Sequence, residues 1–95
     1  MKLPVPILFD WDEGNRDKSW QKHKIHFKET EEVFFNKPVK IFPDKKHSTA
    51  ENRFLGLGRT NNDNLLTIIF TIRNKKLRII SALSQNKKER KIYEK

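Results

Sequence analysis

The amino-acid sequence predicts an α+β domain with an antiparallel β-sheet, two N-terminal helices and one C-terminal helix. Residues 13–36 carry helical patterns, and residues 39–83 carry short apolar runs separated by turn signals. A basic segment with helical character follows. The 95 residues suffice for one domain, and no internal repeat or linker interrupts them. We therefore expect a single unit spanning residues 1–95.

The N-terminal third predicts a short strand and two helices. Ile7 to Phe9 form an apolar run, and Asp12 is a typical N-cap residue for a helix over residues 13–23. A second helix is expected over residues 27–36, because its apolar positions alternate with glutamates that suit a helix N-terminus. Asn36-Lys37-Pro38 ends it.

The remaining chain predicts four strands and a last helix. The most apolar run, residues 65–72, is expected to be a central strand. A polar loop over residues 43–49 and a turn over residues 61–64 separate the neighbouring runs. We expect strands at residues 39–42, 53–60, 65–73 and 77–83, a tight turn at residues 73–76, and a helix capped by Ser84 or Asn86 that ends at Tyr93.

Composition and charge restrict the function. The chain has no cysteine, no apolar run of membrane-spanning length and no signal-peptide core, so we expect a cytoplasmic protein that makes no disulfide and contacts no membrane. The net charge is +9, distributed as −1 over residues 1–32 and +10 over residues 33–95. A basic body of this kind favours a polyanionic partner, although it can also be merely a solvated surface.

The turn between residues 65–73 and 77–83 predicts a register. Asn74 and Lys75 are suitable as the two turn residues of a hairpin. This register pairs Arg73 with Lys76, Ile72 with Leu77, Thr71 with Arg78, and Ile69 with Ile80. Since side chains alternate along a strand, Thr71, Arg73 and Arg78 share one face. The core face then carries Ile68, Phe70, Ile72, Leu77 and Ile79.

Arg53 joins the same face under one condition. A three-residue loop after Thr60 places Arg53 opposite Thr71, whereas a loop of two or four residues turns Arg53 into the core. We expect the first arrangement. Neighbouring arginines suit a phosphate because the guanidinium fork is planar, bidentate and always charged. The alternative is that these arginines are solvated edge residues or partners of Glu51 and Asp44.

The ordered set of motifs resembles the BrnT-like toxins, a family of small bacterial ribonuclease toxins. The resemblance extends from about Phe9 to Tyr93. It is carried by Phe9-Asp10-Trp11-Asp12, Lys22-His23, Phe27, residues 31–35, Asp44, Glu51, Arg53, Gly58-Arg59-Thr60, Thr71-Ile72-Arg73, Arg78-Ile79-Ile80-Ser81-Ala82, Glu89-Arg90 and Tyr93. It implies a RelE-like fold, a metal-independent endoribonuclease of a type II toxin–antitoxin system, and no cofactor. It also implies inhibition by a cognate, BrnA-like ribbon-helix-helix antitoxin, through which alone the complex contacts operator DNA.

Cleavage of RNA needs a base, positive charge on the phosphorane and an acid. His23, His26 and His47 are the candidate histidines, and each can instead be structural. By position in the family pattern, we expect Arg73 and Arg78 to stabilise phosphate charge, His23 or Glu51 to move the proton, and Arg53 to be a further catalytic residue.

Other residues are expected to contact the substrate. Trp11 can stack on a base, although tryptophans in so short a chain are more often in the core, and Trp11 is expected to be more exposed than Trp20. We expect substrate contacts from Trp11, Lys22, Arg59, Lys87, Lys88 and Arg90. The basic helix that carries the last three can instead dock an acidic partner. The histidines lack metal-ligand spacing, so no metal site is expected.

Several residues depart from the family pattern. Lys24 replaces a usual glycine, His26 a serine, Ser19 an asparagine and Gln85 an alanine. Leu83 stands where an arginine commonly follows the Ile-Ser-Ala run, which indicates weakened phosphate binding. Two alternatives to an active toxin therefore stay open: a non-catalytic nucleic-acid-binding module, and an antitoxin-binding protein that has lost activity.

Overall fold

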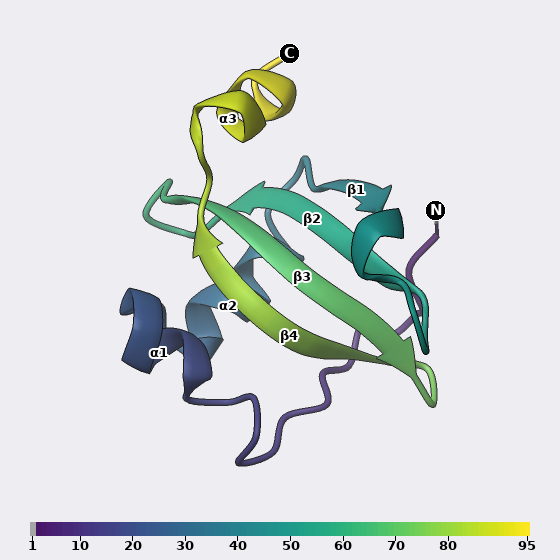
Figure 1. Cartoon of the computed structure of the whole chain (residues 1–95). Helices are drawn as coiled ribbons and strands as arrows, with labels where there is room; N and C mark the ends of the chain where they lie inside the picture. Colours follow the sequence, from purple (N-terminus) through teal and green to yellow (C-terminus); the bar gives the residue numbers. More distant parts are fainter. Residues whose placement is uncertain (1) are drawn as a thin grey trace.

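The computed structural model describes residues 2–95 and confirms the α+β class. A four-stranded antiparallel sheet has the order β1-β2-β3-β4. The strands are β1 (Lys40–Pro43), β2 (Arg53–Arg59), β3 (Leu65–Arg73) and β4 (Lys76–Ser84). The helices are α1 (Lys18–His23), α2 (Phe27–Val33), the 3₁₀ helix η1 (Lys45–His47) and α3 (Lys87–Tyr93). From the first helix onward the chain follows the predicted order of helices and strands, with η1 added after β1 (Figure 1).

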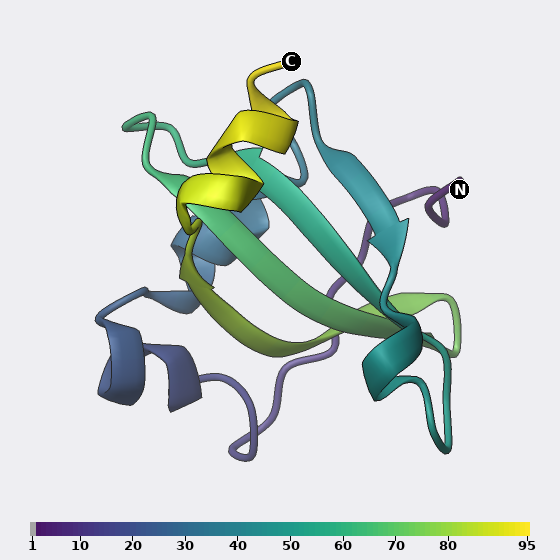
Figure 2. The same cartoon turned by 45° about the horizontal axis from the view of Figure 1, so that its top comes forward.

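The two faces of the sheet have different surroundings. α2 lies behind the sheet in Figure 1, whereas η1 lies in front of it, and the tilted view of Figure 2 agrees. The core is on the α2 side, where Ile68 and Phe70 of β3 are fully buried and Phe34 packs edge-on against Phe70. On the front face, α3 covers one end, where Thr67 donates a hydrogen bond to Glu89, and η1 lies beside the β1–β2 edge. We call the uncovered remainder the open face.

The β3–β4 hairpin forms with the predicted turn. Asn74 and Lys75 both have positive φ, which the type I′ turn of a two-residue hairpin requires. The predicted pairs of Arg73 with Lys76 and of Thr71 with Arg78 are confirmed. The pairing of Ile69 with Ile80 was wrong. A β-bulge between Ile69 and Phe70 shifts the register, so Ile69 pairs with Ser81.

The β2–β3 connection has the three-residue loop that the Arg53 prediction required. The amide of Thr60 donates to the carbonyl of Asn64 at 2.9 Å, which leaves residues 61–63 as the loop. Asp63 takes the left-handed conformation within it. Arg53 is consequently paired with Thr71.

The N-terminal segment differs from the prediction. Residues 7–9 make only one parallel bridge, between Phe9 and Leu77 of β4. The helix expected over residues 13–23 starts at Lys18, because residues 13–17 form turns. The side chain of Asn15 instead donates to the carbonyl of Ile79. The Ser19 hydroxyl accepts from the amide of Ala82, so this segment covers the outer edge of β4.

The helix ends explain two departures from the family pattern. Lys24 ends α1 in the left-handed conformation at φ 58°, which glycine adopts without strain. His26 takes the N-cap position of α2, which serine commonly fills, and its side chain accepts from the amide of Lys28. α2 ends at Val33, three residues earlier than predicted, and Asn86 caps α3 as one of the two expected caps.

Candidate active site on the open face

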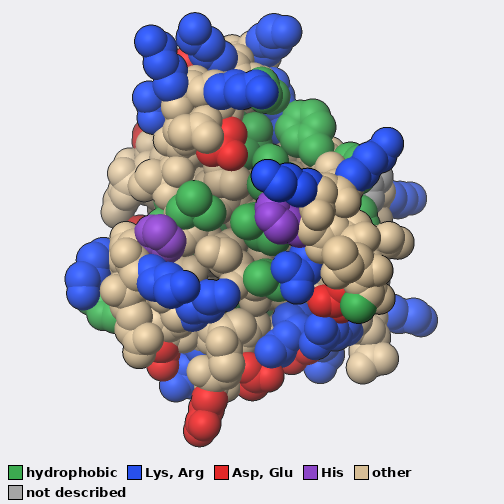
Figure 3. Space-filling model, in the orientation of Figure 1, with side chains coloured by type: hydrophobic (Ala, Val, Ile, Leu, Met, Phe, Trp, Pro, Cys, Tyr) green, Lys and Arg blue, Asp and Glu red, His purple; other side chains and the backbone are tan. Residues whose placement is uncertain are grey.

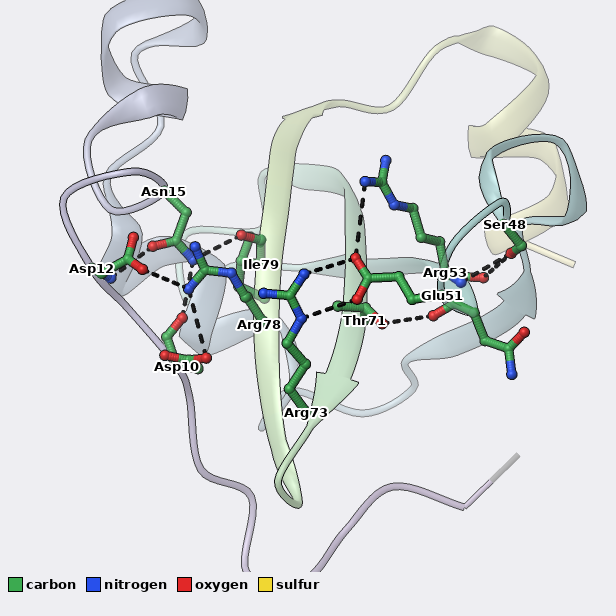
Figure 4. A network of polar contacts seen from close by, with 11 residues as sticks. Asp10, Asp12, Asn15, Ser48, Glu51, Arg53, Thr71, Arg73, Arg78 and Ile79 are labelled. Atoms are coloured by element: carbon green, nitrogen blue, oxygen red, sulfur yellow. Dashed lines mark hydrogen bonds and ion pairs between the residues drawn. The ribbon is translucent and has the colours of Figure 1, made fainter.

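Three arginines from three neighbouring strands lie on the open face. Arg53 of β2 lies opposite Thr71 of β3, and Thr71 lies opposite Arg78 of β4. Arg73 is two residues beyond Thr71 and points to the same side. Figure 4 shows the guanidinium group of Arg73 directed toward Glu51 and that of Arg78 directed toward Asp10 and Asp12, and a dashed line joins Arg53 to Glu51. The predicted shared face is therefore present, and we call Arg53, Arg73 and Arg78 the arginine cluster.

Glu51 joins two members of the cluster. Its carboxylate accepts two hydrogen bonds from Arg73, from Nε and Nη2, each at 3.0 Å. Arg53 Nη2 lies 4.0 Å from the same carboxylate. The hydrogen bond from Arg73 lowers the pKa of Glu51, against the opposing effect of desolvation. A carboxylate with a lowered pKa is a weak proton acceptor, so the geometry favours Glu51 as the group that orients the arginines.

Arg78 is held by two carboxylates of the N-terminal segment. Its Nη1 lies 2.9 Å from Asp12 Oδ2 and 3.6 Å from Asp10 Oδ2. Its side chain is only 18% exposed, and the hydrogen bond to Asp12 raises its pKa. The same contact lowers the pKa of Asp12. Sequence reasoning missed these partners, although both acids belong to the Phe9-Asp10-Trp11-Asp12 motif.

Backbone and hydroxyl contacts fix the loop before β2. The Thr71 hydroxyl donates to the carbonyl of Asn52 at 2.7 Å, directly beside Glu51. The Ser48 hydroxyl accepts from the amide of Arg53 at 2.9 Å and donates to the carbonyl of Asp44 at 2.6 Å. The loop that delivers Glu51 is thus attached to two strands of the sheet.

The Ser48 contacts also place an Asp–His pair. Asp44 Oδ2 lies 2.9 Å from His47 Nδ1. The amide of Asp44 donates to the carbonyl of Arg53 at 2.8 Å, which continues the β1–β2 ladder by one residue. Asp44 therefore extends the row of Arg53, Thr71 and Arg78 across the sheet.

The predicted contributors from the helical N-terminal region lie elsewhere. Trp11 donates from Nε1 to Glu31 at 2.8 Å and packs against the ring of Phe27, so it joins the N-terminal segment to α2. Lys22 and His23 are exposed in the last turn of α1. Within residues 2–95 no hydrogen bond or ion pair connects either of them to the arginine cluster. Trp20, expected to be less exposed than Trp11, is 48% exposed, so that ranking was wrong.

The remaining predicted substrate contacts lie at the far end of the sheet. Arg59 pairs with Asp63 at 3.5 Å and donates to the carbonyl of Lys37. Lys87 and Lys88 are exposed on α3, while Arg90 donates from Nη1 to the carbonyl of Gln85. Six strand residues separate Arg78 from the end of β4, roughly 20 Å. Figure 3 shows Lys and Arg side chains at both ends of this side of the molecule and hydrophobic side chains between them.

The open face also carries the substituted position of the family pattern. Leu83 is paired with Thr67 of β3 and is half-buried. The neighbouring row of the open face carries Phe42, Leu55 and Ile69. An arginine at position 83 would lie between the arginine cluster and α3, so its replacement by leucine leaves an apolar strip there.

Two further features concern metals and membranes. Residues 2–95 contain no group of three or more His, Asp or Glu side chains placed to hold a metal ion. The helices of the same range are all too short and too polar to cross a bilayer.

Comparison with known proteins identifies the family. The model of the family described as "Ribonuclease toxin, BrnT, of type II toxin-antitoxin system" matches residues 11–89. The 1.1 Å crystal structure of the Brucella abortus ribonuclease toxin BrnT matches with a TM-score of 0.64 and 25% identity, covering 85% of this chain and 99% of that chain. No curated protein sequence matches. The resemblance inferred from the ordered motifs is confirmed, and the chain belongs to the BrnT family of ribonuclease toxins from type II toxin–antitoxin systems.

Proposed function

We propose that this toxin cleaves RNA without a metal ion, at the arginine cluster of the open face. The placement of Arg53, Arg73 and Arg78 on one face of three neighbouring strands is the observation that carries the proposal. Guanidinium groups can neutralise the scissile phosphate and the charge that develops on the phosphorane. In this proposal Arg73 and Arg78 contact the phosphate directly, and Glu51 and Asp12 orient them.

The pairing of the arginines with carboxylates is compatible with this role. Arg73 uses Nε and Nη2 for Glu51, which leaves its Nη1 for another acceptor. Asp12 is exposed and can turn toward water when a phosphate approaches Arg78. Orientation before the substrate arrives reduces the reorganisation that the reaction requires.

Cleavage of a defined RNA by the purified protein in EDTA tests the proposal. We expect Arg73→Ala and Arg78→Ala each to lower the cleavage rate by about 10²- to 10³-fold, as loss of one charge-stabilising donor does. Arg16→Ala is the matched control, because Arg16 is exposed and its contacts are with Asp17 at 3.7 Å and the ring of Phe27, away from the arginine cluster. Cleavage that depends on added metal, or a folded wild type that binds RNA in a salt-dependent way without cutting it, contradicts the proposal. The second outcome identifies a nucleic-acid-binding module.

The apolar strip provides a test of weakened activity. If Leu83 reduces phosphate binding, Leu83→Arg should increase RNA cleavage and toxicity, because the new charge would lie between the two basic ends of the face. Leu83→Lys would show whether charge alone is sufficient. An unchanged rate in both variants would mean that the open face does not need a cation at this position.

We further propose a ribbon-helix-helix antitoxin as the cognate partner, acting in the cytoplasm, with operator DNA bound only through that antitoxin. The family membership and the basic body of the chain support this proposal, since an acidic segment of an antitoxin would complement it. A short adjacent reading frame for a ribbon-helix-helix protein is the first observation to seek. The co-purified complex should shift operator DNA, and the toxin alone should not.

A further inference from the structure

The three histidines of the chain have different surroundings. His26 is occupied as a helix cap, because its Nδ1 accepts from the amide of Lys28 and its ring stacks on Phe27. His23 is exposed at the end of α1, which packs beside β4. His47 is the histidine whose ring nitrogen contacts a carboxylate, with 2.9 Å between Nδ1 and Asp44 Oδ2.

Asp44 is placed to orient this imidazole. Its side chain is 14% exposed, whereas that of His47 is 53% exposed. A carboxylate that accepts from Nδ1–H selects the tautomer with a lone pair on Nε2. The imidazole is thereby fixed through one nitrogen, and the other is available to a ligand from solvent.

The pair lies at one end of the arginine row. Asp44 pairs with Arg53, so alternation along β1 puts it on the same side of the sheet as Phe42, which faces Leu55. Figures 1 and 2 both place η1, which carries His47, on the open side of the sheet. Ser48, the next residue, bonds to both Asp44 and Arg53. His47 is therefore attached to the strand that delivers Arg53.

We propose that His47 is the general base of the RNA cleavage and that Asp44 is its positioning residue, an inference that rests on the proposed function. Nε2 of His47 accepts the proton of the 2′-hydroxyl as the 2′-oxygen bonds to phosphorus. The bond from phosphorus to the 5′-oxygen breaks, and that oxygen takes a proton from water. The products are a 2′,3′-cyclic phosphate and a 5′-hydroxyl end. His47 returns its proton to solvent.

Single-turnover cleavage in EDTA separates His47 from the other histidines. We expect His47→Gln to lower the rate by about 10²- to 10⁴-fold, as loss of a general base does, while RNA affinity stays within about threefold. His26→Asn is the matched control, since asparagine preserves the helix cap, and should retain the wild-type rate. A full rate for His47→Gln, or a larger loss for His23→Gln than for His47→Gln, overturns the proposal. Thermal unfolding confirms that each variant is folded.

Two further measurements test whether His47 acts as the general base, as the general acid or only as a structural residue. A substrate with a 5′-bridging sulfur needs no acid for its leaving group, so His47→Gln should stay slow on it; a restored rate would make His47 the acid. The wild-type rate should fall as the solution is acidified, because protonated imidazole accepts no proton, and His47→Gln should lose this dependence. The charged groups nearest to His47 in the structure are Asp44, which contacts the ring, and Lys45 and Lys46 of η1. Arg53 is linked to the same loop through Ser48, and Glu51 lies beside Arg53.

Loss of cleavage in Arg78→Ala together with full activity in His47→Gln would refute this inference alone. A folded wild type that cleaves no RNA would refute the inference and the proposed function together. Asp44→Asn should lower the rate less than His47→Gln, because it disturbs the tautomer and leaves the imidazole in place. Equal rates for Asp44→Asn and the wild type would exclude the positioning role.

Discussion

Gly58 is the position at which the packing of α2 against the sheet is most sensitive to one added carbon. A Cβ at Gly58 would lie 2.5 Å from Val33 Cγ1 and 3.4 Å from the carbonyl oxygen of Val33. Favourable carbon contacts need about 3.5–4.0 Å, so the two elements must separate by about 1 Å. β2 is paired on both sides, and Val33 is fully buried with a stiff χ1 angle, so neither group yields easily. Gly58→Ala should therefore destabilise the fold.

The expected loss follows from two opposing effects. Overpacking of a core costs about 1–3 kcal/mol, and replacing glycine by alanine returns about 0.4–1 kcal/mol through the unfolded chain. We expect a net loss of about 1–2 kcal/mol, out of a total of about 5–14 kcal/mol for a chain of this length. The melting temperature should fall by about 4–16 °C.

Urea denaturation and calorimetry of Gly58→Ala measure this loss, with Gly56→Ala as the matched control on the same strand and the same face. The nearest atom to a Cβ at Gly56 is 3.4 Å away on the ring of Phe70, so that variant should change little. Val33→Ala removes the clashing methyl group, and Gly58→Ala should cost nothing further in that background. Equal losses at the two glycines, or strictly additive losses with Val33→Ala, would refute the reasoning.

Other variants test the remaining features. Lys24→Gly should stabilise the protein by about 1 kcal/mol relative to Lys24→Ala, because only glycine relieves the left-handed backbone; equal melting temperatures would contradict this. The pKa values of Asp12 and Glu51 are lowered from 3.8 and 4.5, so their contribution to stability exists above these values and disappears as pH falls through the lower folded-state values. The urea concentration at the unfolding midpoint should be higher for the wild type than for Asp12→Asn/Glu51→Gln at pH 6, and equal for the two proteins in strong acid. A difference that does not change with pH would exclude this dependence of stability on the two carboxylates. Lys87→Ala/Lys88→Ala should reduce the salt dependence of RNA binding by about two phosphate contacts without changing the rate of the bound complex, whereas an unchanged salt slope would remove α3 from the interface.

The strand pairing could be predicted from the turn residues and the alternation of side chains, whereas the β-bulge could not. Asn74-Lys75 selects a two-residue turn, and the alternation of β3 then places Thr71 opposite Arg78. The bulge at Ile69 and Phe70 has no such signal, because both residues belong to an uninterrupted apolar run. The predicted register of Arg73 and Arg78 was right because both lie between the turn and the bulge.

The N-terminal segment shows how a tertiary contact overrides a local preference. Asp12 is a good N-cap, but its carboxylate accepts from the amide of Gly14 and pairs with Arg78, so no helix starts there. The side chain of Asn15 donates a hydrogen bond to Ile79 at the free edge of β4, 64 residues away in the chain. Neither partner is visible in the local sequence. The arginine cluster was therefore predictable, whereas the acids that hold Arg78 were not.

In this protein, different charged residues serve the attraction of RNA and the cleavage reaction. The cluster of Arg53, Arg73 and Arg78 is balanced by three carboxylates in contact with it, those of Asp10, Asp12 and Glu51. A balanced cluster attracts a distant polyanion weakly, yet it holds its guanidinium forks in fixed directions. The excess positive charge behind the net charge of +9 therefore lies on other surface residues, among them the exposed lysines of α3. Long-range attraction of RNA and the orientation of one phosphate thus depend on different residues of the same face.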